Sequence, residues 1–140
     1  RAECAGRVLL QTYQPEHPVM RALAAGDRDS FIAGETALRK EGVWPPFGKL
    51  VALILSGHQG DQVKATAFNV ARSAPDDTAI RVLGPAPAPL AMLRGKHRWR
   101  LLVKTTRSVK VQNVLSSWLS EVKIPNAVRL HVDIDPQSFL

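Results

Sequence analysis

The segment Trp44–Phe47, with the sequence Trp-Pro-Pro-Phe, constrains the fold of this chain more than any other feature. Each proline fixes its own φ and disfavours the helical region for the residue before it, so no helix passes through the centre of the segment. We therefore expect a stiff connector with two aromatic anchors. We predict a domain boundary there, with residues 1–47 on one side and residues 48–140 on the other.

Residues 1–47 are expected to form one short strand followed by two helices. An apolar run predicts the buried strand, and a glycine after each of two stretches with helical spacing predicts the helix ends. The expected elements are a strand at Gly6–Thr12, a helix from Val19 to Ala25, and a helix from about Asp29 to Lys40.

The remaining residues alternate between strand-like and helix-like patterns. The expected elements are strand Lys49–Gly57, helix Asp61–Ser73, strand Thr78–Leu83, loop Gly84–Leu93, strand Arg94–Thr106, helix Ser108–Val122 and strand Ala127–Ile134. This β-α-β-β-α-β order predicts an α+β fold, the ferredoxin-like split βαβ, preceded by the strand and the helical linker.

Positive charge is concentrated in one part of the chain. The net charge is +7, yet the window from Thr78 to Ser120 holds eight basic residues and no acidic one, so the rest of the chain sums to −1. A local excess of this kind is typical of a surface that binds a polyanion.

Five cations in this window share one strand face, because side chains alternate along a strand. They are Arg94, Lys96, Arg98, Arg100 and Lys104, while His97, Trp99, Leu101 and Val103 form the opposite, core-like face. We predict that the five cations contact DNA phosphates, with Arg107 and Lys110 extending the patch. The alternative is an ordinary solvated face. A separate alternative for Arg98 alone is a role in the fold, in which a carboxylate such as Asp133 or Asp135 holds it.

No catalytic or metal-binding pattern is present in the sequence. It lacks a phosphate-binding loop and an H-E-x-x-H motif, the four histidines have no ligand spacing, and Cys4 is the single cysteine. Asp133 and Asp135 share a strand face, but no third ligand accompanies them. We therefore predict no catalytic residue, no metal site and no ATPase activity for this chain. We also predict no membrane association, because no apolar run approaches the roughly 18 residues of a membrane span.

Several strings together resemble the C-terminal end of the primosomal protein N-prime (PriA) family of replication-restart DNA helicases. The matching residues, in order, are Gly6–Thr12, Gln14–Pro18, Phe31, Glu35, Arg39, Pro45–Phe47, Gly84–Leu90 (Gly-Pro-Ala-Pro-Ala-Pro-Leu), Arg98 and Val132–Pro136 (Val-Asp-Ile-Asp-Pro). The two long strings are the specific ones. The chain begins with Arg1, without an initiator Met or a signal peptide, so we expect it to be cut from a longer protein.

The resemblance implies a bacterial parent that is an ATP-dependent 3′→5′ helicase. Such a parent recognises stalled or branched forks and helps to assemble the primosome in the nucleoid-associated cytoplasm. Its ATP, Mg and zinc sites would lie upstream, so no cofactor is expected in this chain. Residues 1–47 would end the second helicase lobe, and residues 48–140 would form the DNA-binding domain.

The resemblance also implies a docking site for the acidic tail of single-stranded DNA-binding protein. The family uses an Arg and a Gln one helical turn apart. Gln112 matches the Gln, but the Arg position falls on Ser108, with Arg107 and Lys110 as neighbouring substitutes. A pure protein-interaction module, with incidental DNA contact, is therefore the alternative to the DNA-binding module.

Overall fold

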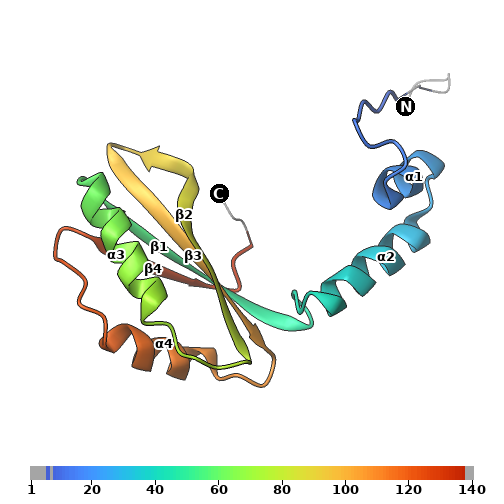
Figure 1. The fold of residues 1–140 in the computed structure, drawn as a ribbon. Coiled ribbons are helices and arrows are strands. Elements are labelled where there is room, and N and C mark those ends of the chain that lie inside the picture. Colours follow the sequence, from blue (N-terminus) through green and yellow to red (C-terminus); the bar gives the residue numbers. More distant parts are fainter. Residues whose placement is uncertain (1–5, 7, 138–140) are drawn as a thin grey trace. The chain divides into compact units, whose positions relative to one another are not determined.

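The computed structural model describes residue 6 and residues 8–137 of the chain. It divides the chain into two compact units, Arg1–Gly42 and Val43–Leu140 (Figure 1). The split falls beside the proline connector, and Trp44–Phe47 belongs to the second unit. Assignment of the first unit to the end of a helicase lobe stays a prediction.

The first unit holds two capped helices, α1 (Pro18–Ala25) and α2 (Arg28–Glu41). Gly26 ends α1 in the left-handed region, with a φ of 67° that glycine adopts without strain. Asp27 is the N-cap of α2, and the hydrogen bond from the Ser30 backbone N–H holds the pKa of the Asp27 carboxyl below its ordinary value. Both helices were predicted, and neither contains a buried residue.

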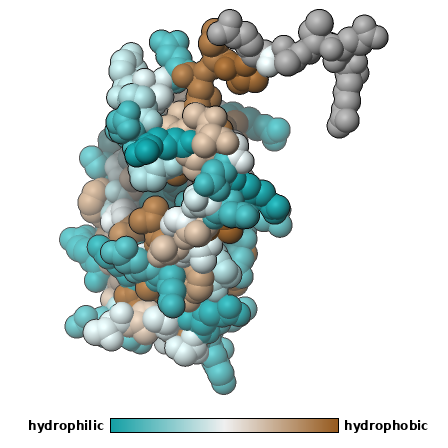
Figure 2. Space-filling model, turned by 90° about the vertical axis from the view of Figure 1, so that its right-hand side faces the viewer, coloured by the Kyte–Doolittle hydropathy of each residue, from teal (hydrophilic) through white to brown (hydrophobic). Residues whose placement is uncertain are grey.

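The buried strand predicted at Gly6–Thr12 is wrong for the residues that the structure describes there, which are residue 6 and residues 8–12. They form no strand, and the side chains of Val8 and Leu9 are each 91% exposed. A strand needs a partner to satisfy its backbone N–H and C=O groups, and no described strand pairs with this segment. Figure 2 shows the exposed hydrophobic side chains on one side of the molecule in brown, among mostly teal and white side chains.

The second unit is a four-stranded antiparallel sheet with two helices. Its elements follow the predicted order, with ends that shift by a few residues: β1 (Gly48–Gly57), α3 (Gly60–Arg72), β2 (Ile80–Leu93), β3 (Lys96–Thr106), α4 (Val111–Ser120) and β4 (Arg129–Ile134). The strands lie in the order β2-β3-β1-β4, and every neighbouring pair is antiparallel. The chain is therefore a mixed α+β protein.

The core lies between the sheet and the two helices, which cover the same face (Figure 1). Alternate residues of β1 (Val51, Leu53 and Leu55) are fully buried and pack with residues of α3, β3 and α4. Trp118 of α4 is buried too, and its indole N–H donates to Ser73 at the end of α3 over 3.1 Å. The central part of this face, along β1, is therefore closed to solvent.

The loop predicted at Gly84–Leu93 is wrong, because β2 continues through it to Leu93. Prolines led to the loop prediction, but β2 is an edge strand, where a missing N–H on the outer side breaks no ladder hydrogen bond. Two register shifts absorb the irregular residues. The hairpin then turns at Arg94 and Gly95, with φ values of 51° and 73°, as in a type I′ turn. Arg94 therefore lies in this turn and not on the predicted strand.

No helix among the described residues is long and apolar enough to cross a membrane.

Candidate nucleic-acid interface

The cations of β3 lie on the sheet face that the helices leave uncovered. Lys96, Arg98, Arg100 and Lys104 alternate with Trp99, Leu101 and Val103, and the last three belong to or pack against the core. The predicted shared face is confirmed for these four cations. Arg94 is the exception because it lies in the hairpin turn.

Neighbouring strands add cations to the same face, because partners in an antiparallel pair point to the same side. Arg81 of β2 lies opposite Lys104. Ser56 of β1 lies between Arg98 on one side and Arg129 on the other. The strand residues of this face, which we call the open face, include the cations Arg81, Lys96, Arg98, Arg100, Lys104 and Arg129, together with the acid Asp133.

The centre of the open face is neutral. β1 contributes Leu50, Ala52, Ile54 and Ser56, so β1 places no charge between the cations of β3 and Arg129. Opposite Ala52 on β4 lies Asp133, the single acidic residue of the face. Six cations against one carboxylate make a surface that favours an anionic partner.

One end of the open face is occupied by the connector. The Lys104 ammonium lies 4.6 Å from the centroid of the Trp44 ring, and Leu50, the cross-strand partner of Lys104, is buried. The Arg107 guanidinium donates to the backbone carbonyl of Pro46 over 3.0 Å. Lys104 and Arg107, both predicted to contact phosphate, therefore also hold the connector. Trp44 itself is half-buried.

Arg98 contacts the backbone of the neighbouring strand. Its guanidinium donates a long hydrogen bond of 3.5 Å to the carbonyl of Leu90. Asp133 of β4 and Leu102 of β3 are both cross-strand partners of Ala52. Leu102 is four positions further along β3 than Arg98, so Asp133 and Arg98 are not neighbours in the sheet. In the part of the chain that the structure describes, Arg98 forms no ion pair with Asp133 or Asp135. The alternative in which Asp133 or Asp135 holds Arg98 is therefore not found among the described residues.

The residues predicted to bind the acidic tail lie before and at the start of α4. Lys110 and Gln112 are both exposed there. The helix begins at Val111, so Ser108 lies in the preceding turn, 3.0 Å from the hydroxyl of Thr106. The resemblance implied that positions 108 and 112 lie one turn apart on a helix. The structure differs, because Ser108 precedes the helix. Arg107, the neighbouring substitute, is turned toward Pro46.

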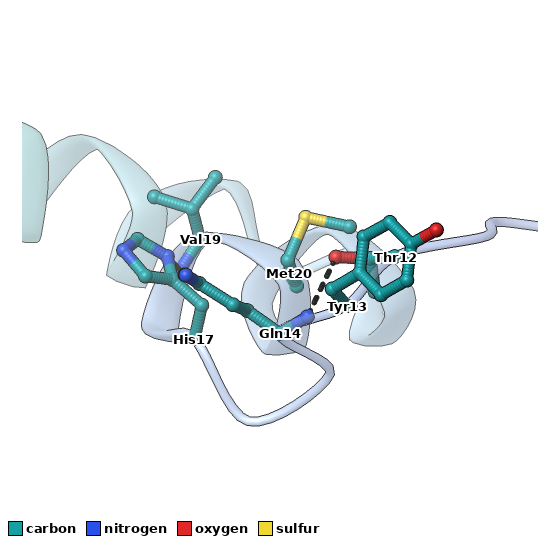
Figure 3. A pocket seen from close by; sticks show the side chains of 6 residues that line it. All are labelled: Thr12, Tyr13, Gln14, His17, Val19 and Met20. Carbon is teal, nitrogen blue, oxygen red and sulfur yellow. Dashed lines mark hydrogen bonds between the residues drawn. The ribbon is translucent and has the colours of Figure 1, made fainter.

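A hollow in the first unit has little chemical character. Figure 3 shows its lining, which comes from Thr12, Tyr13, Gln14, His17, Val19 and Met20. The Gln14 N–H donates to the Thr12 hydroxyl over 3.0 Å, and His17 accepts from the Val19 N–H as the cap of α1. The Thr12 hydroxyl and the His17 ring thus accept hydrogen bonds from the local backbone, and we assign this hollow no reaction.

Metal-ligand chemistry is also limited. Among the residues that the structure describes, no three His, Cys, Asp or Glu side chains come together in a way that could hold a metal ion. Cys4 lies outside the described residues. The zinc that the resemblance implies for a longer parent, upstream of this chain, stays a prediction.

Two cations of the open face, Arg81 and Arg129, were missed as site residues in the sequence. Arg81 lies in the window without acids, so its charge was visible, but only the register places it opposite Lys104. Arg129 lies outside that window, close to Glu121 and Asp133 in sequence. Strand order is the information that brings Arg129 to the open face.

Comparison with known proteins identifies relatives over nearly the whole chain. The family model for the primosomal protein N C-terminal domain matches residues 40–137. The replication restart protein PriA of Rickettsia conorii is 39% identical over 139 residues, which are 99% of this chain and 21% of that protein. The proteins of the same name from Synechocystis and Bacillus subtilis are 35% and 26% identical, over 99% and 97% of this chain and 17% and 18% of their own lengths. The chain thus spans about a fifth of the curated relatives that it matches.

Proposed function

This chain belongs to the family of primosomal protein N C-terminal domains, and on that premise we propose that it is a DNA-binding module of a replication-restart protein. The observation that carries the proposal is the open face, which carries six cations from three strands and one carboxylate. Phosphate groups along a DNA strand are the polyanion that such a surface suits.

The binding is expected to tolerate changes in DNA sequence. The cations lie on strands, and both helices of the second unit, α3 and α4, pack on the opposite face, so neither presents side chains from the open face to base edges in a groove. Phosphate contacts position a protein on DNA without specifying its sequence. Selectivity for forked or branched DNA would then come from the shape in which phosphates are presented.

The direct like-charge pair on the open face supports the same proposal. Arg81 and Lys104 are cross-strand partners, and like charges directly opposite each other destabilise a sheet. A bound phosphate between two cations removes that repulsion. The pair therefore adds two positive charges to the part of the open face where we propose that a phosphate binds.

The fold is proposed to be the ferredoxin-like split βαβ. This assignment is supported by the element order β1-α3-β2-β3-α4-β4, by the sheet order β2-β3-β1-β4 and by two helices on one face. In this arrangement α3 and α4 both pack on the face opposite the cations of the open face.

Activities of a longer parent are part of the proposal. It would be an ATP-dependent 3′→5′ helicase that uses Mg and zinc sites outside this chain and helps to assemble the primosome on bacterial DNA. The sequence of this chain holds no phosphate-binding loop, so we propose that it contributes binding and no ATP hydrolysis.

A second candidate function is docking of the acidic tail of single-stranded DNA-binding protein. It is favoured by the exposed Lys110 and Gln112 at the start of α4, a helix without an acidic residue in its first turn. Helix N-termini and nearby cations attract carboxylates. Lys110 supplies the charge there, because the Arg107 guanidinium is hydrogen-bonded to Pro46.

Salt dependence distinguishes the two functions. The affinity of the chain for a forked DNA and for an acidic peptide with an apolar end would be measured at several salt concentrations. Each DNA phosphate that a cation neutralises releases counterions and contributes about −0.9 to the slope of log affinity against log salt. Four to six such contacts therefore predict a slope of roughly −4 to −5. A fork affinity that hardly changes with salt would contradict the DNA-binding proposal, whereas tight peptide binding with weak fork binding would favour the second candidate.

A further inference from the structure

The cations of β3 form a single row along the open face. Lys96, Arg98, Arg100 and Lys104 occupy every second position of the strand except one, which is taken by Leu102. Because an antiparallel strand advances about 3.4 Å per residue, successive positions of the row are about 7 Å apart and the whole row is about 27 Å long. Successive phosphates of one DNA backbone have nearly the same spacing. The row therefore matches five phosphates, with one cation missing.

The position of β3 inside the sheet favours phosphates over a peptide. β3 is paired with β2 on one side and with β1 on the other, whereas peptides that bind to sheets add a strand at a free edge. A peptide that lay across this row would gain only ion pairs at the protein surface, which contribute little. A DNA strand also releases its condensed counterions when the same cations neutralise its phosphates.

The strands beside β3 add single cations to the open face and not a second row. β2 contributes Arg81 at the Lys104 end, and β4 contributes Arg129 together with the acid Asp133. A duplex presents two backbones, and each winds round the helix axis, so that either one follows an extended row for only a short distance. One extended row of cations is therefore suited to one extended backbone, which a single strand can adopt.

The side chains around the row predict binding that depends mainly on phosphates. Among the described residues of β1 and β3, the open face carries glycine and aliphatic, polar or basic side chains. The Trp44 ring lies at one end of the row, where it already contacts Lys104. Stacking of bases on aromatic rings, which supports many single-strand binders, therefore has little part along this row.

We propose that one single strand of DNA lies along β3 with five successive phosphates at the row. Four of them are held by Lys96, Arg98, Arg100 and Lys104, and one passes Leu102 without a charged contact. The inference rests on the proposed DNA-binding function, and it adds the form of the DNA, which is a single-stranded arm of a fork.

The gap at Leu102 allows a test by the gain of one contact. Leu102→Lys completes the row, so it should make the slope of log affinity against log salt steeper by about 0.7 for a single-stranded oligothymidylate bound to the whole chain. Ala65→Lys adds the same charge at an exposed position of α3, on the other face of the sheet, and should leave the slope unchanged. Thermal unfolding reports whether each variant is folded.

A second variant tests the row without altering its packing. Lys96 is exposed, and Lys96→Gln should make the slope for the same oligothymidylate shallower by about 0.7. Lys123→Gln removes an equal charge from an exposed position after α4 and should not change the slope. This pair decides the matter if Leu102→Lys does not fold.

The length and the form of the DNA provide a further measurement. Affinity for oligothymidylates of increasing length should rise steeply until about five phosphates are covered, because the row then has no further cation. Unlabelled single strands should displace a labelled oligothymidylate at a lower phosphate concentration than linear duplex does.

Four outcomes overturn the inference. Equal slopes for Leu102→Lys and Ala65→Lys, or for Lys96→Gln and Lys123→Gln, would show that binding follows net charge. If duplex competes better than single strands while the salt slope stays steep, the single-strand inference fails and the proposed function survives. If Lys96→Gln weakens binding of an acidic peptide but not of DNA, the row is a peptide site. If the chain binds no DNA, both proposals fail.

Discussion

The two faces of the sheet differ in what they contribute to the protein. The covered face packs fully buried residues such as Leu53 and Leu101 against α3 and α4. The open face carries cations from three strands around a neutral centre. Adjacent residues of one strand thus serve different purposes, since side chains alternate between the faces. Stability and DNA binding should therefore respond to different substitutions, often one position apart.

The largest expected effect is on stability from the covered face. Leu101→Ala should lower the free energy of unfolding by about 2–5 kcal/mol, because it removes a fully buried side chain and leaves a cavity. Leu102→Ala, one residue along β3, is the matched control and should cost clearly less, because Leu102 is half-buried on the open face. Chemical denaturation measures both values. Equal losses for the two variants would mean that the faces do not differ in packing.

Removal of the Trp44 ring tests the end of the open face where the connector lies. Trp44→Ala should lower the free energy of unfolding by about 1–3 kcal/mol, because it loses apolar contact and the cation–π interaction with Lys104. Trp44→Phe keeps a ring and should recover part of the loss. An unchanged denaturation midpoint in Trp44→Ala would show that the connector is not anchored to the sheet.

Arg129 tests whether the site extends across β1 to β4. Arg129→Ala should reduce the salt slope of fork binding by about one unit with little change in stability, because the side chain is exposed on the open face. Lys123→Ala removes the same charge from an exposed position after α4 and should leave the slope unchanged. Identical slopes in both variants would restrict the site to β2 and β3.

The smallest effect concerns the cross-strand pair of cations. Arg81→Ala should raise the free energy of unfolding by a few tenths of a kcal/mol at low salt, because it relieves repulsion with Lys104. The gain should vanish at high salt, where the charges are screened. A loss of stability at low salt would indicate that Arg81 makes a favourable contact in the folded state.

Most of the element order was predictable from the sequence, because apolar periodicity determines local structure. The helix predictions around α1, α2 and α3 and the alternation along β3 depend on neighbours in the chain, and the structure confirms them. The proline-rich part of β2 was not predictable in this way. Its strand conformation depends on the edge position in the sheet, which is a property of strand order.

The candidate site was predictable only in part for the same reason. Charge and parity indicated the cations of β3, but the placement of Arg81 and Arg129 beside them requires the pairing of three strands. Contacts of Lys104 with Trp44 and of Arg107 with Pro46 join residues about 60 positions apart, which no local pattern contains. That any of these residues contacts DNA stays a prediction.

The most direct test of the account compares two variants of equal charge. One replaces Lys96, Arg98 and Arg100 of the open face with alanine, and the other replaces Lys64, Arg72 and Lys123, which lie on α3 and after α4. The account predicts that the first variant lowers the salt slope of fork binding by about three units and the second leaves it unchanged. Equal slopes for the two variants would contradict it, because binding would then follow net charge and not the open face.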